Sequence, residues 1–154
     1  MIVTAGDFDN PQVRALLHLH LAGMHAASPP EHVHALDLSG LRQPDIHFVT
    51  AWDGGDLLGC GALRELSPHQ GEIKSMRTRP EHLSKGVGGA ILNHLLVIAR
   101  DRGYRTVSLE TGTGAPFQAA VALYTRFGFI QGAPFGDYRA NAFSRFFHLT
   151  LDRS

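Results

Sequence analysis

A glycine-rich hexapeptide in the second half of the chain has the composition of a loop that binds phosphate groups. Glycine lets the backbone approach a ligand closely, and an apolar pattern of helical spacing begins directly after the loop. The first N–H groups of a helix have no partner inside the helix, so they favour an anion at its N-terminus. We therefore expect the backbone of this loop to bind a phosphate or pyrophosphate, with an ammonium adding charge, through Ser84, Lys85, Gly86, Val87, Gly88 and Gly89.

Three classes of ligand could place a phosphate there. A P-loop requires Ser or Thr after its lysine, whereas Gly86 follows Lys85. A dinucleotide site expects a third glycine where Ile91 stands, although Glu110 lies near the spacing of a ribose-binding carboxylate. Acyl-CoA also carries a pyrophosphate, and its pantetheine arm can pair like an added strand. The spacing excludes the P-loop and leaves a nucleotide-dependent oxidoreductase as a weaker alternative to acyl-CoA.

Two segments resemble the GCN5-related N-acetyltransferases, the GNAT family. Residues 72–89 (EIKSMRTRPEHLSKGVGG) are similar to the family's fourth strand and phosphate loop, and residues 123–129 (LYTRFGF) to its L-Y-x-x-x-G-F segment. The resemblance implies an acetyl-CoA-dependent N-acetyltransferase, with acetyl-CoA as co-substrate. Leu83 stands where the family usually has Gln or Arg, which predicts weakened cofactor binding, and Gln118 stands where a cofactor-binding Asn is frequent.

Acetyl transfer to an amine makes three chemical demands. The amine must lose a proton, the carbonyl oxygen must be stabilised as it becomes negative, and the departing thiolate needs a proton. The resemblance assigns the last task to Tyr124, because a phenol with a pKa of about 10 keeps its proton at neutral pH. It places Met76, Arg77 and Thr78 along the pantetheine arm, and the backbone N–H of Met76 is the expected oxyanion donor.

The sequence indicates more than one candidate for the general base and only a broad class of acceptor. By resemblance Glu72 is the catalytic carboxylate, Glu110 is its competitor, and water could replace both. A carboxylate with a pKa of about 4.3 is a poor base unless burial raises that pKa. The acceptor is expected to be a small-molecule primary amine, amino acid-like in character, whose carboxylate could pair with Arg139 or Arg145. A non-catalytic acyl-CoA sensor is the alternative function.

Hydrophobic patterning predicts the elements that position these residues, in an α/β (α+β) arrangement. Strands are expected at 2–4, 46–53, 56–66, 72–78, 106–110, 129–130 and 143–151. Helices are expected at 10–27, just after Ser28, at 88–103 and at 116–126, whose inward residues would be Ala119, Ala120, Leu123 and Phe127. A helical crossover forces the fourth and fifth strands to run parallel. By resemblance these two strands splay apart in a mixed sheet of six to seven strands with about four helices.

The composition limits the kinds of function that the chain can have. The 154 residues carry 14 Lys+Arg and 14 Asp+Glu, a formal net charge of zero that gives no electrostatic argument for nucleic acid or a membrane surface. The length predicts a single domain over residues 1–154. A lone cysteine, Cys60, excludes an internal disulfide, and with no signal peptide pattern this favours the cytoplasm. Ten histidines show no helical ligand pair, so no metal site is expected, and a homodimer is compatible with the resemblance.

Overall fold

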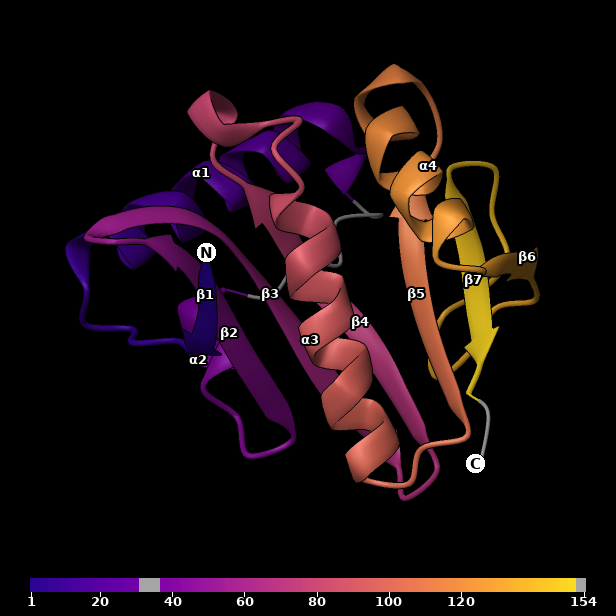
Figure 1. Cartoon of the computed structure of the whole chain (residues 1–154). Helices are drawn as coiled ribbons and strands as arrows, with labels where there is room; N and C mark the ends of the chain where they lie inside the picture. The colour runs from indigo at the N-terminus through magenta and orange to yellow at the C-terminus, as the bar shows by residue number, and fades with distance from the viewer. Residues whose placement is uncertain (31–36, 152–154) are drawn as a thin grey trace.

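The computed structural model describes residues 1–30 and 37–151 (Figure 1). In chain order the elements are β1 (Ile2–Ala5), α1 (Pro11–Ala27), α2 (Leu38–Leu41), β2 (Ile46–Asp53), β3 (Asp56–Ser67), β4 (Gln70–Thr78), η2 (Pro80–His82), α3 (Val87–Asp101), β5 (Thr106–Gly112), η3 (Ala115–Phe117), α4 (Gln118–Arg126), β6 (Ile130–Gly132) and β7 (Ser144–Thr150). No described helix is long and apolar enough to cross a membrane.

The strands form one mixed seven-stranded sheet in the order β1-β2-β3-β4-β5-β7-β6, which confirms the predicted fold class. β4 and β5 are parallel, and the other neighbouring pairs are antiparallel. The parallel pairing covers only residues 70–72 of β4 and 106–108 of β5. Beyond those residues the two strands diverge, and the gap faces α4 (Figure 1).

Helices cover both faces of the sheet, with α3 on one face and α1 on the other (Figure 1). The apolar stripe of α3 packs in a cluster with Leu63, Ile73 and Val107, and the stripe of α1 packs in a second cluster with Phe48 and Cys60. Cys60 is fully buried, and burial raises the pKa of its thiol to about 12, so it is an inert core residue as expected.

Local sequence signals account for several boundaries. Asn10 caps α1 because its side chain accepts hydrogen bonds from the backbone N–H groups of Gln12 (2.9 Å) and Val13 (3.4 Å), and Pro11 occupies the first turn. The turn between β2 and β3 uses Gly54 with φ 58°, a left-handed conformation that favours glycine.

Three of the predictions about secondary structure and burial are wrong, and a fourth concerns residues that the structure does not describe. The segment 36–45, which the sequence predicts to be irregular, includes the short helix α2 at Leu38–Leu41, whose cap is the Asp37 carboxylate accepting from the Gly40 N–H at 2.8 Å. β6 begins at Ile130 and not at Phe129. Ala119, expected to point inward, is exposed, and the buried residue of α4 is Tyr124. The helix predicted after Ser28 falls on residues 31–36, outside the described residues.

Candidate active site

The predicted phosphate loop has a backbone suited to anions. Ser84 and Gly86 both have positive φ, 64° and 81°, the left-handed conformation that occurs in anion-binding backbone nests. α3 begins at Val87 with no side-chain cap, so its first N–H groups remain available to a ligand. Lys85 Nζ lies 3.2 Å from His82 Nδ1, which holds the ammonium beside the loop. The left-handed loop residues and the uncapped start of α3 are compatible with a bound pyrophosphate.

The divergence of β4 from β5 exposes a strand edge next to the loop. β4 lacks a β5 partner from Ile73 onward, so the edge of the strand that includes Met76 faces the gap. A pantetheine amide can hydrogen-bond to such an edge in the way that an added strand does. The loop and the edge together are therefore compatible with acetyl-CoA.

A β-bulge in β4 decides which side chains face α1. Cys60 pairs with Arg77 and Ala62 with Lys74, so Gly61 alone stands opposite Ser75 and Met76. Ser75 takes up the extra residue with φ 56°. An unbroken strand would place Lys74 and Arg77 on opposite faces. The bulge places both of them on the face covered by α1.

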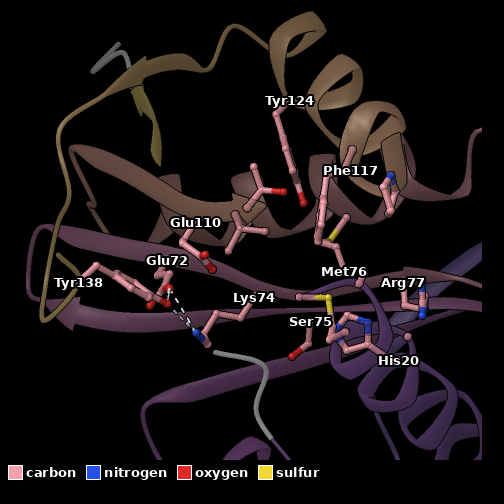
Figure 2. Close-up of a pocket in the computed structure, with 17 residues that line it drawn as sticks. His20, Glu72, Lys74, Ser75, Met76, Arg77, Glu110, Phe117, Tyr124 and Tyr138 are labelled. Atoms are coloured by element: carbon pink, nitrogen blue, oxygen red, sulfur yellow. Dashed lines mark hydrogen bonds and ion pairs between the residues drawn. The ribbon is translucent and has the colours of Figure 1, made fainter. Parts of the chain in front are cut away.

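The splayed strands, α1, α4 and the loop before β7 enclose a cavity of about 190 Å³ (Figure 2). The lining residues are His20, Gly23, Met24, Ala27, Glu72, Ile73, Lys74, Ser75, Met76, Arg77, Glu110, Thr111, Pro116, Phe117, Ala120, Tyr124 and Tyr138. Two carboxylates, two cationic side chains and two phenols thus meet in one cleft, at the point where β4 leaves β5.

Tyr124 enters this cleft from α4, and its phenol oxygen points toward β4 (Figure 2). The side chain packs edge-on against Phe129 and is 6% exposed. Burial raises the pKa of the Tyr124 phenol above its usual value, because the charged phenolate would be poorly solvated. Tyr124 therefore holds its proton throughout the neutral range.

A buried ion pair lies at the β7 end of the cleft. Lys74 Nζ donates to Glu72 Oε2 at 3.3 Å and to the Tyr138 hydroxyl oxygen at 3.0 Å, and the Tyr138 hydroxyl donates to the same Glu72 oxygen at 2.6 Å. The side chains of Lys74 and Glu72 are only 7% and 2% exposed. Burial, followed by the negative charge of Glu72, raises the pKa of the Tyr138 phenol. The three groups hold one another in place.

The structure brings some of the predicted site residues together and separates others. Glu72, Met76, Arg77 and Tyr124 line the cleft, and the loop at 84–89 lies at the start of α3. Thr78 is next to the loop, 3.9 Å from the position that a Gly88 Cβ would occupy. Other candidates lie on the exposed surface and do not line the cleft, namely Gln118, Arg139 and Arg145.

Several polar cleft residues were not named as site residues from the sequence, namely His20, Lys74, Ser75, Thr111 and Tyr138. Lys74 is a charged residue within a predicted strand, and His20 interrupts the apolar stripe of α1, so each left a detectable signal in the sequence. Tyr138 lies before β7 in the segment 135–145, which the family resemblance places on the acceptor side, although no periodic pattern indicates the residue itself.

Comparison with known proteins identifies the family. The model of the Acetyltransferase (GNAT) family matches residues 13–129. The chain belongs to the GNAT family. It is 47% identical over 149 residues (97% of this chain, 94% of the other) to the uncharacterized N-acetyltransferase YedL of Escherichia coli. It is 49% identical over 138 residues (90% and 91%) to the uncharacterized N-acetyltransferase YsnE of Bacillus subtilis.

A solved structure agrees with this GNAT assignment over the whole fold. The putative acyl-CoA N-acyltransferase from Klebsiella pneumoniae superposes with a TM-score of 0.81 at 29% identity, covering 98% of this chain and 97% of the other. Other solved chains of this fold are complexes with coenzyme A or acetyl-CoA. This GNAT protein is an N-acetyltransferase, and acetyl-CoA is its co-substrate.

Proposed function

We propose that this GNAT enzyme transfers an acetyl group to the primary amine of an amino acid-like small molecule by direct attack on the thioester. The observation that carries the proposal is the cleft itself, in which Tyr124, Glu72 and the unpaired edge of β4 converge. Acetyl-CoA supplies the activated acetyl group. The side chains and backbone of this chain bind it, orient the acceptor and move the protons.

Tyr124 is the proposed general acid. Its buried phenol keeps the proton at neutral pH and releases it only when a stronger base, the departing thiolate, develops beside it. The backbone N–H of Met76 is the proposed donor to the carbonyl oxygen as negative charge develops there. This donor is a backbone group, so it needs no side-chain rearrangement. Its position is set by the bulge at Ser75, the residue that precedes Met76.

Glu72 is the proposed acceptor of the amine proton. Lys74 and Tyr138 both donate to Oε2, so we place the incoming proton on Oε1. Glu110 also lines the cleft and remains the competing base. Separate Glu72→Gln and Glu110→Gln variants decide between them, because loss of the base lowers kcat by roughly 10²- to 10⁴-fold while loss of a bystander does not.

For the cofactor we propose that the backbone of Arg77 and Thr78, and not their side chains, follows Met76 along the pantetheine arm, and that the backbone of residues 84–89 binds the pyrophosphate. Lys85 adds charge there, and Gln118 is the proposed contact from α4. The Leu83 side chain is 59% exposed beside the loop. Because it is apolar, it offers the cofactor no hydrogen-bond donor. We further propose that the enzyme works in the cytoplasm as one domain, alone or as a homodimer.

Two linked measurements test this function. Calorimetric titration with acetyl-CoA is expected to show saturable binding that NAD(P)H does not compete for. A screen of primary amines, followed by release of the coenzyme A thiol, is then expected to find turnover. Saturable binding without thiol release from any amine would instead identify an acyl-CoA sensor, and no binding at millimolar acetyl-CoA would contradict the enzyme assignment for this site.

A further inference from the structure

Three residues at the α1 end of the cleft each have a buried side-chain atom that forms no hydrogen bond with the described residues. The His20 Nδ1, Ser75 Oγ and Arg77 Nε atoms are closed off from water and make no hydrogen bond within residues 1–30 and 37–151. All three residues line the cavity that holds Tyr124 and Glu72. Leaving a buried polar atom unsatisfied is unfavourable, so such groups call for an explanation in a ligand or a functional role.

Arg77 is held in this position by α1. Its Nη2 donates to the carbonyl oxygen of Leu19 at 3.2 Å, and it packs so closely on Gly23 that a Cβ there would lie 2.1 Å from Nη2. A fixed guanidinium thus lines the cleft, and no carboxylate of residues 1–30 and 37–151 forms an ion pair with it.

The neighbours of Arg77 are donors without negative charge. Burial, and then the nearby charge of Arg77, lower the pKa of His20 to about 4, so the ring is neutral at pH 7 and can donate through one nitrogen. Ser75 adds a hydroxyl, and its positive φ shows that the backbone is bent at this residue. The other cationic side chain of the cleft, Lys74, is already neutralised by Glu72.

The cleft therefore has two chemically distinct ends. Figure 2 shows Glu72, Lys74, Tyr138 and Glu110 in one group, with Ser75 and His20 apart from them. We propose that Arg77, Ser75 and His20 form a subsite for one carboxylate of the acceptor. The acceptor is then an amino acid, whose amine lies beside Tyr124 and the Met76 N–H and whose carboxylate lies toward α1. The inference rests on the proposed acetyl transfer to a small amine and specifies that substrate.

The geometry favours a carboxylate close to the amine. Ser75 and Arg77 flank Met76, and consecutive Cα atoms lie about 3.8 Å apart, so the subsite adjoins the proposed oxyanion donor. An α-amino acid spans such a distance. The single full positive charge of the subsite matches a monoanionic carboxylate better than a doubly charged phosphate, and a guanidinium can hold both carboxylate oxygens.

Matched acceptors test the subsite directly. Thiol release from acetyl-CoA is measured with the twenty L-amino acids and, for each one accepted, with its carboxamide and its decarboxylated amine. We expect kcat/KM for the amino acid to exceed that for either analogue by about 100-fold. Calorimetry of the same amino acid with the coenzyme A-saturated enzyme supplies a readout that does not depend on turnover.

Substitutions then locate the effect. Arg77→Gln is expected to raise the KM and the calorimetric Kd for the amino acid by about 10- to 100-fold while leaving those for the decarboxylated amine unchanged. Ser75→Ala is expected to act in the same direction by a smaller factor, and it decides the question if Arg77→Gln does not fold. The control Arg100→Gln removes an exposed arginine from α3, on the other face of the sheet, and leaves both acceptors unaffected.

The outcomes distinguish failure of the carboxylate subsite from failure of the proposed acetyl transfer. Equal turnover of amino acid and decarboxylated amine, or an Arg77→Gln effect that is the same for both, overturns the carboxylate subsite and leaves acetyl transfer standing. Absence of thiol release from every acceptor, together with failure to bind acetyl-CoA, overturns the proposed function and the subsite together.

Discussion

The buried pair of Lys74 and Glu72 makes a strong prediction about stability. Replacing Lys74 with Met keeps the length of the side chain and removes its charge, which leaves the Glu72 carboxylate buried at 2% exposure without its counter-charge. Replacing both residues, in Lys74→Met/Glu72→Gln, removes the two charges together and retains an oxygen that can accept from Tyr138. The single variant is therefore expected to be less stable than the double variant.

The magnitude follows from the distance and the burial. At 3.3 Å and an effective dielectric constant of 20, the Coulomb attraction is about 5 kcal/mol before desolvation is counted. Loss of one partner of a buried pair typically costs about 3–5 kcal/mol, whereas replacement of both partners is close to neutral. We expect Lys74→Met to lose about 3 kcal/mol or more of unfolding free energy and the double variant to recover most of that loss.

Urea unfolding at pH 7 measures both variants, and the chain contains a matched control. Arg64 and Asp45 pair at 3.1 Å, a similar distance, but both side chains are 41% exposed, so Arg64→Met should cost about 0–1 kcal/mol. Burial would then be the property that distinguishes the two pairs. A Lys74→Met loss no larger than that of Arg64→Met, or a double variant as unstable as the single one, would refute this reasoning.

Three further variants test other parts of the structure. The pKa of His20 is about 4 in the folded protein and about 6.5 in the unfolded chain, so the free energy of unfolding decreases as pH falls from 6.5 toward 4. Urea unfolding at a series of pH values should show that His20→Gln removes about 3 kcal/mol of this decrease. The same pH profile in the variant and the wild type would contradict this role of His20. Gly23→Ala should displace the Arg77 guanidinium and raise the acceptor KM about 10-fold without lowering Tm; an unchanged KM would argue against this packing. Gly86→Ala should weaken acetyl-CoA binding about 10-fold in calorimetry because φ is 81°, whereas equal affinity would mean that the loop geometry is not required.

The elements with strong hydrophobic patterns could be predicted from the sequence. β2 has the expected bounds, and α1 begins at the expected cap, because both depend on local signals. The parallel pairing of β4 with β5 followed from the length of the crossover, and the glycine pattern before α3 predicted a loop whose backbone suits an anion.

The acceptor side could not be predicted in the same way, because it depends on pairing between distant residues. The bulge at Ser75 arises where β4 meets Gly61 of β3, and it moves Arg77 to the α1 face. Tyr138 reaches Glu72 across 66 positions of sequence, from a segment with no regular pattern. Arg139, the neighbouring residue expected as a possible partner of an acceptor carboxylate, lies on the exposed surface instead.

The role of Tyr124 is the central claim about catalysis, and one comparison tests it most directly. The kcat for thiol release is measured for the wild type and for Tyr124→Phe, with the acetyl-CoA Kd of each determined by calorimetry. The account predicts that kcat falls by roughly 10²- to 10⁴-fold while the Kd stays within about twofold, because only the proton donor is lost. An undiminished kcat in Tyr124→Phe would contradict it.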